Sequence, residues 1–219
     1  MNLLLPFGNS PFIIKERNYK KNFKNIIMKK ILLLAALALY GVSAQAQLKP
    51  FVSFDYSDEE KRSTGAKNAG VNVTIGIKAP NKWEYSIKAG YSDPAAGTSN
   101  SQNVEAKIKK SFDIGAPVIP YIGLRVGQKT QIPSTPNRIV HYAVDLGIKI
   151  PIAHGFALDV GSRYRNSFES SDNFDSVRHH ATLLYDFNEN NTVGLRYTQS
   201  HGADAESKNA WRVHYTYTF

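Results

Sequence analysis

The sequence predicts an all-β fold: a closed, antiparallel, up-and-down transmembrane β-barrel of ten strands, with eight strands as the alternative. Three observations predict this fold. Apolar and polar residues alternate with a period of two through ten segments, charged residues keep to one side of that alternation, and aromatic residues gather at the segment ends. None of the 219 residues is cysteine, so disulfides, thiolate metal sites and a cysteine nucleophile are excluded.

The first 46 residues predict export. Met28-Lys29-Lys30 is a short basic region, and the apolar run that follows it, residues 31–41, is shorter than the ~20 residues of a membrane-spanning helix. Ala44 and Ala46 form the small-x-small pattern of a signal-peptidase site, with cleavage before Gln47. We therefore expect a signal peptide over residues 28–46 and the barrel over residues 47–219. Residues 1–27 are expected to precede the true start, or else to form an unusually long basic region.

The net charge of +9 does not indicate a nucleic-acid partner. Residues 1–46 hold 7 of the 27 basic residues and 1 of the 18 acidic ones, which leaves a net charge of +3 on the rest of the chain. A nucleic-acid-binding protein would carry a basic patch in its folded part. No such patch remains once the leader is removed, so we expect no nucleic-acid partner.

Ten alternating segments follow the leader. They cover residues 52–56, 71–78, 83–91, 104–112, 121–127, 140–150, 156–165, 177–187, 193–198 and 211–219. In the last segment, Trp211, Val213, Tyr215, Tyr217 and Phe219 alternate with Arg212, His214, Thr216 and Thr218. A soluble sandwich also alternates, but it would place its largest rings in the middle of strands. Aromatic residues at both ends of the segments predict instead the two interfacial girdles of a membrane barrel.

The connections between segments predict two unequal ends of the barrel. Tight turns are expected at residues 79–82, 113–117, 151–155 and 188–191, and longer polar loops near residues 57–69, 92–101, 129–137, 168–175 and 201–208. Short turns at one end and long loops at the other are typical of outer-membrane barrels. In lipid such a sheet must close on itself, because every backbone polar group needs a partner.

On these residues the chain resembles the small Gram-negative outer-membrane β-barrels, of the OmpA/OmpX-like and opacity-like type, over Gln47 to Phe219. The terminal positions Tyr215, Tyr217 and Phe219 resemble the signature by which the barrel assembly machinery recognises its clients. The resemblance implies an outer-membrane location with periplasmic termini, and contacts with outer-membrane lipid and lipopolysaccharide. It also implies handling by periplasmic chaperones and the assembly machinery, and a monomeric state. The best-known small members have eight strands, whereas ten segments are counted here.

The inward positions of the predicted barrel carry the candidate site. Their charged residues are Asp55, Glu84, Lys88, Glu105, Lys107, Arg125, Asp145, Lys149, Asp159, Arg163, Arg165, Arg178, Asp186, Arg196 and Arg212. One interpretation is a solvated network of ion pairs that keeps the narrow lumen from collapsing. The other is a narrow pore whose excess of positive charge favours anions.

No motif in the sequence indicates catalysis. His141, His180 and His214 fall on inward positions, but their spacing is not that of a metal site, and phosphate-binding loops and nucleophile elbows are absent. We therefore expect no cofactor and no enzymatic activity. The expected function is an integral outer-membrane protein with a structural or loop-display role; an anion-favouring porin is the alternative, and an outer-membrane hydrolase comes third.

Overall fold

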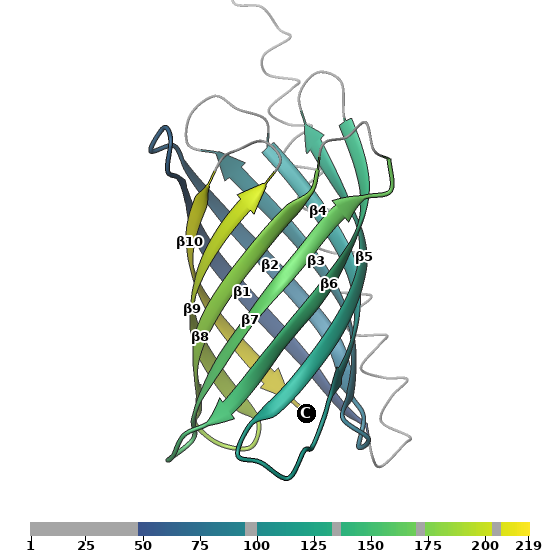
Figure 1. Cartoon of the computed structure of the whole chain (residues 1–219), viewed down its shortest axis with the longest axis vertical. Helices are drawn as coiled ribbons and strands as arrows, with labels where there is room; N and C mark the ends of the chain where they lie inside the picture. The colour runs from purple at the N-terminus through teal and green to yellow at the C-terminus, as the bar shows by residue number, and fades with distance from the viewer. Residues whose placement is uncertain (1–47, 95–99, 133–136, 170–173, 203–206) are drawn as a thin grey trace, which may run out of the picture. The chain divides into compact units, whose positions relative to one another are not determined.

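The computed structural model describes residues 48–94, 100–132, 137–169, 174–202 and 207–219, which form ten strands (Figure 1). The strands are β1 (Lys49–Lys61), β2 (Lys67–Lys78), β3 (Trp83–Pro94), β4 (Asn100–Ser111), β5 (Ile119–Ile132), β6 (Asn137–Pro151), β7 (Phe156–Ser167), β8 (Ser176–Asp186), β9 (Asn191–Gly202) and β10 (Lys208–Thr218). Each strand pairs with its neighbours in the sequence, and β1 pairs with β10. The predicted ten-stranded, closed, up-and-down barrel is confirmed, and the eight-strand alternative is wrong. Within the described residues, no helix is long and apolar enough to cross a membrane.

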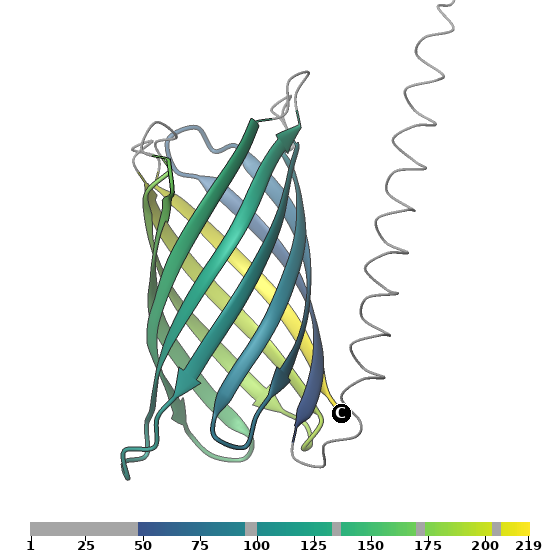
Figure 2. The same cartoon turned by 90° about the vertical axis from the view of Figure 1, so that its right-hand side faces the viewer.

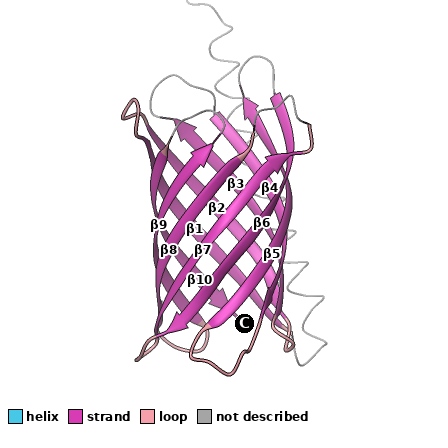
Figure 3. Cartoon of the chain, viewed as in Figure 1, coloured by secondary structure: helices cyan, strands magenta, loops and turns pink. Residues whose placement is uncertain are grey.

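Closure of the barrel depends on the pairing of its first and last strands. The β1–β10 ladder is antiparallel and runs from Phe51 opposite Thr218 to Lys61 opposite Lys208. Every other ladder is also antiparallel and keeps a single register along its length. Figure 2 shows the barrel from a second side, and Figure 3 shows that the described residues are strands joined by loops and turns. Because a closed sheet has no edge, its backbone groups find partners without water.

The exposure of side chains separates an apolar outer face from a polar inner face. On outward positions, Ile87 is 61% exposed and Leu124 is 53% exposed. On inward positions, Glu105 is 4% exposed, Asp145 is 5% exposed and Thr182 is fully buried. A barrel dissolved in water would place its apolar residues inside, so the observed distribution is that of a barrel surrounded by lipid.

The connections between strands define the two ends of the barrel. We call the end with the β2–β3, β4–β5, β6–β7 and β8–β9 connections the turn end, and the opposite end the loop end. Predicted turns at the turn end are confirmed, with residues 79–82, 112–118, 152–155 and 187–190 outside strands. β1 begins at this end and β10 finishes there.

The expected length of the loop between β1 and β2 is wrong, because the strands continue into it, whereas the connection between β7 and β8 spans the expected residues 168–175. Between β1 and β2, only residues 62–66 lie outside strands, where a loop over residues 57–69 was expected. Polar residues near the strand ends resemble loop residues in sequence, yet they pair across the ladders. Lys208 Nζ, for example, lies 3.6 Å from a carboxylate oxygen of Glu59. The other four connections include residues outside the described part of the chain.

Two neighbouring turns are joined by an ion pair at the turn end. Lys82, in the β2–β3 turn, adopts a left-handed conformation with φ of 63°, and its Nζ donates a hydrogen bond to Asp113 Oδ2 at 2.8 Å. Asp113 Oδ1 accepts a second hydrogen bond, from the backbone N–H of Gly115, at 3.2 Å. The Lys82 ammonium and this N–H hold the pKa of Asp113 below its ordinary value.

Aromatic side chains pack against one another on the outer face at both ends of the barrel. At the turn end, the ring of Tyr185 lies 4.6 Å from that of Phe156 and 4.8 Å from that of Phe187. At the loop end, the rings of Tyr197 and Trp211 lie 5.0 Å apart. Aromatic rings at these two levels are typical of the interfacial girdles of membrane barrels.

Candidate functional site

The structure places all fifteen predicted lumen charges on inward positions of their strands. By strand they are Asp55 on β1; Glu84 and Lys88 on β3; Glu105 and Lys107 on β4; Arg125 on β5; Asp145 and Lys149 on β6; Asp159, Arg163 and Arg165 on β7; Arg178 and Asp186 on β8; Arg196 on β9; and Arg212 on β10. They do not form one network. The structure brings some of them into ion pairs and leaves others with hydroxyl partners.

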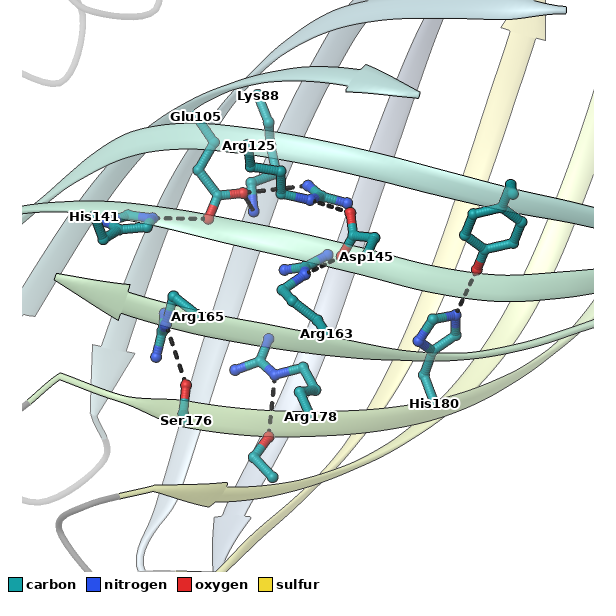
Figure 4. Close-up of polar contacts among 12 residues, drawn as sticks. Lys88, Glu105, Arg125, His141, Asp145, Arg163, Arg165, Ser176, Arg178 and His180 are labelled. Atoms are coloured by element: carbon teal, nitrogen blue, oxygen red, sulfur yellow. Dashed lines mark hydrogen bonds and ion pairs between the residues drawn. The ribbon is translucent and has the colours of Figure 1, made fainter. Parts of the chain in front are cut away.

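A chain of ion pairs crosses five strands on one side of the lumen (Figure 4). Lys88 Nζ lies 2.6 Å from Glu105, and Arg125 links Glu105 at 3.4 Å to Asp145 at 2.5 Å. Arg163 then reaches the second oxygen of Asp145 at 2.6 Å. Two of these contacts follow from register, because Lys88 pairs with Glu105, and Asp145 with Arg163, directly across their ladders. These ion pairs offset the charges of the side chains that form them, and they tie the strands β3 to β7 together.

A second ion-pair cluster lies nearer the turn end. Glu84, on β3, contacts the ammonium groups of both Lys107 and Lys109 on β4, with Lys109 at 2.9 Å. Lys109 lies directly opposite Glu84 in the β3–β4 ladder. The single carboxylate is therefore shared by two cations, so this end of the lumen also retains positive charge.

His141 is an inward residue of β6 whose side chain is almost fully buried. Its side chain is 1% exposed, and its Nε2 lies 3.3 Å from Glu105 Oε1. The imidazole thereby extends the ion-pair chain toward the loop end (Figure 4). Among the described residues, no group of three or more His, Asp or Glu side chains could hold a metal ion.

Sequence reasoning assigned no role to Tyr121, which crosses the lumen toward β7 and β8. Its hydroxyl donates a hydrogen bond to Asp159 Oδ1 at 2.8 Å and lies 3.3 Å from His180 Nε2. Space for the phenol comes from Gly147 and Gly161, which pair directly across the β6–β7 ladder. Two inward glycines at one level of the barrel are the sequence signal that could have predicted a large ring above them.

The arginines on the opposite side of the lumen contact hydroxyl groups instead of carboxylates. Arg178 donates from Nε to Ser200 Oγ at 3.0 Å, and Arg196 donates from Nε to Thr182 Oγ1 at 2.7 Å. Arg212 Nε is buried and has no hydrogen-bond partner among the described residues. On β8 to β10, Arg178, Arg196 and Arg212 therefore make no ion pair within the described residues, whereas the cations of the chain from Lys88 to Arg163 are paired with carboxylates.

The lumen widens into a cavity of about 390 Å³ at the loop end. Eight basic and two acidic side chains line it within the described part of the chain: Lys61, Lys88, Lys129, Arg163, Arg165, Arg178, Lys208 and Arg212, with Glu59 and Glu105. We call this cavity the basic chamber. Such a surplus of positive charge, enclosed by low-dielectric walls, concentrates anions.

One polar pair lies on the outer face. His179 points outward, to the opposite side from its neighbour His180, and its Nδ1 lies 2.7 Å from Ser162 Oγ, its direct partner in the β7–β8 ladder. The ladder has no bulge at this point, because its register is unchanged from Phe156 to Arg165. The hydrogen bond satisfies both polar groups on a surface that is otherwise apolar.

The residues of the expected assembly signal lie on the outer face at the turn end. Phe219 donates its backbone N–H to the carbonyl of Pro50 at 2.8 Å, and its ring lies edge-on to that of Tyr217 at 4.8 Å. Tyr215 donates from its hydroxyl to Asn191 Oδ1 at 2.5 Å. The expected cleavage site at Ala44, Ala46 and Gln47 lies outside the described residues.

An apolar outer face, a charged lumen and ten closed strands define a small β-barrel of the membrane-spanning class. No protein-family model matches the chain, and no curated protein matches its sequence. Its structural neighbours are outer-membrane β-barrels, including porins and autotransporter β-domains.

Three of these neighbours illustrate the likeness. NanC porin matches with a TM-score of 0.51 and 12% identity, over 75% of this chain and 98% of that chain. The β-domain of the Bordetella autotransporter BrkA matches with a TM-score of 0.50 and 10% identity, over 79% of this chain and all (100%) of that chain. KdgM porin matches with a TM-score of 0.47 and 12% identity, over 76% of this chain and 99% of that chain. At such identities the likeness is one of fold.

Proposed function

We propose that this protein is an integral outer-membrane β-barrel that admits small anions to its lumen and lets them pass, without catalytic activity. The observation that carries the proposal is the basic chamber, where eight cations face two carboxylates. Rings of basic side chains give a pore its preference for anions. The outer-membrane location is supported by the apolar outer face, the signal-peptide pattern and the likeness in fold to outer-membrane barrels.

The sequence favours a different role, a structural barrel or one that displays surface loops. Strands β1 and β2 run almost to their connection, leaving residues 62–66 between them. A connection this short exposes little surface to a partner. A purely structural barrel remains the second candidate, and the ion-pair chain from Lys88 to Arg163 favours it, because such a chain braces the wall and narrows the lumen.

Single-channel conductance of the purified protein in planar bilayers tests the proposal. We expect steady conductance and, across a gradient of potassium chloride, a reversal potential that indicates preference for chloride. Arg178→Gln should reduce that preference, because Arg178 lines the chamber and makes no ion pair within the described residues. Lys110→Gln is the matched control, since it removes the same charge from the outer face, where Lys110 Nζ contacts the Asn81 carbonyl.

The outcome decides between the two candidates. A barrel that inserts and stays silent under these conditions would contradict the channel proposal and leave the structural role. Cation preference in the unmodified protein would contradict it equally.

A further inference from the structure

We infer that Arg163, Arg178 and Arg212, backed by Arg196, form a binding site for a compact, multiply charged oxyanion, a phosphate or sulfate group, at the floor of the basic chamber. The four residues lie on the adjacent strands β7, β8, β9 and β10. Arg163 pairs directly with Arg178 across one ladder, and Arg196 with Arg212 across another. The inference deepens the proposed function, since it needs the chamber to be reachable by anions.

Two like-charged pairs placed directly across ladders work against folding. Cross-strand pairs of the same charge repel each other, and a barrel usually offsets them with neighbouring carboxylates. Here Asp145, which binds Arg163, is the one carboxylate within ion-pair distance of the four among the described residues. Asp145 also binds Arg125, so its charge is shared. An arrangement that is unfavourable in the empty barrel and favourable with an anion indicates a binding site.

The hydrogen bonds of these side chains suit an oxyanion. Arg178 and Arg196 are each anchored at Nε by a hydroxyl group of the wall. Such a bond orients the guanidinium without using its two terminal nitrogens, which can donate in parallel to two oxygens of one anion. Arg212 contributes a buried Nε that lacks a partner in the described structure. A tetrahedral oxyanion offers a separate oxygen to each of the paired donors, whereas a chloride ion offers a single acceptor to both.

The cavities place the anion on the chamber side of the arginines. Arg163, Arg178 and Arg212 line both the basic chamber and a second void of about 10 Å³, which Arg196, His180 and Thr198 complete. The arginines therefore form a layer between the two spaces. The void has room for about one water molecule. The chamber, at about 390 Å³, can hold an oxyanion together with a larger molecule that carries it.

The test is binding of inorganic phosphate to the detergent-purified protein, by calorimetric titration at constant ionic strength with chloride as the background anion. We expect saturable binding of one phosphate per barrel, with sulfate competing. The variant Arg178→Gln/Arg212→Gln should weaken binding at least tenfold. Lys149→Gln is the matched control, because Lys149 is an inward cation of β6 that does not line the chamber, and it should change the affinity less than twofold.

A conservative variant separates the effect of the paired guanidinium donors from the effect of positive charge alone. Arg178→Lys keeps the positive charge and removes the paired donors, so phosphate should bind several-fold more weakly while the barrel stays folded. Should the double variant fail to fold, this variant and the unmodified protein still decide the matter. Binding that does not saturate, or that Lys149→Gln weakens as much as the double variant does, would overturn the site.

The site and the proposed channel can fail separately. Saturable phosphate binding to a barrel that conducts no ions would support the site and contradict the channel. Anion conductance without saturable phosphate binding would support the channel and overturn the site.

Discussion

Gly147 lies directly opposite Gly161 in the β6–β7 ladder, and the hydroxyl of Tyr121 occupies the space above both. A Cβ atom added to Gly147 would lie 2.3 Å from Tyr121 Oη and 2.7 Å from the carbonyl oxygen of Val160. One added to Gly161 would lie 2.8 Å from the same hydroxyl. The glycine pair therefore sets the position from which Tyr121 reaches Asp159 and His180.

Gly147→Ala should destabilise the barrel by about 1–3 kcal/mol, because the new methyl group overpacks the wall and displaces the phenol. Urea-dependent unfolding in lipid vesicles measures this free energy. Gly202→Ala is the control, since its Cβ would come no closer than 3.3 Å to the atoms around it. Equal losses in the two variants would show that the contact with Tyr121 is not responsible.

Asp145→Asn should cost about 3–5 kcal/mol of unfolding free energy, because Arg125 and Arg163 would both lose their short carboxylate contacts in a weakly hydrated lumen. The same urea titration measures the cost. Asp186→Asn provides the comparison: Asp186 is also inward, but the bond it accepts comes from the Thr192 hydroxyl, at 2.6 Å. It should cost clearly less. A smaller loss for Asp145→Asn than for Asp186→Asn would refute a stabilising ion-pair chain.

Leu183→Arg should destabilise the barrel by about 2–4 kcal/mol, because Leu183 is an outward residue of β8 that lies inside the aromatic level of Tyr185, where its side chain faces the hydrocarbon of the bilayer. Val177→Arg lies on the same face of the same strand, near the loop end, and should cost about 0–1 kcal/mol at the membrane interface. Unfolding in vesicles reports both values. Equal costs at the two positions would mean that Leu183 does not lie deeper in the bilayer than Val177.

Phe219→Ser should reduce the amount of folded barrel in the outer membrane of cells, because it removes the terminal aromatic of the expected assembly signal. Phe187→Ser is the control, since Phe187 is also an exposed aromatic at the turn end. Heat-modifiable migration of membrane fractions measures the folded amount in each case.

Refolding the Phe219→Ser protein into vesicles without cellular factors should succeed, because the backbone N–H of residue 219 still reaches Pro50. Normal assembly of Phe219→Ser in cells would contradict the signal. Failure of the same variant to refold in vesicles would make the effect structural.

Periodicity sorted the residues into two faces. In a strand, neighbouring side chains point to opposite sides, so alternation was enough to place Leu183 on the outer surface and Arg178 in the lumen. It was also enough to predict ten strands and the four turns of the turn end. The loop between β1 and β2 was predicted too long, because polar residues such as Glu59 continue the strand pattern while resembling loop residues.

Which charges meet was decided by the tertiary structure. The period of two says that Arg163, Arg178 and Asp145 share the lumen, but it does not say which of them lie opposite one another. Register places Arg163 between Asp145 on one side and Arg178 on the other, so that the ion-pair chain ends at β7 and arginines without an ion pair in the described structure follow on β8 to β10. Closure of β1 on β10 then brings residues from the two ends of the sequence around one chamber. The sidedness of each residue is a local property of an extended backbone, whereas the chamber exists only because distant strands pair, and distant pairing leaves no periodic signal in the chain.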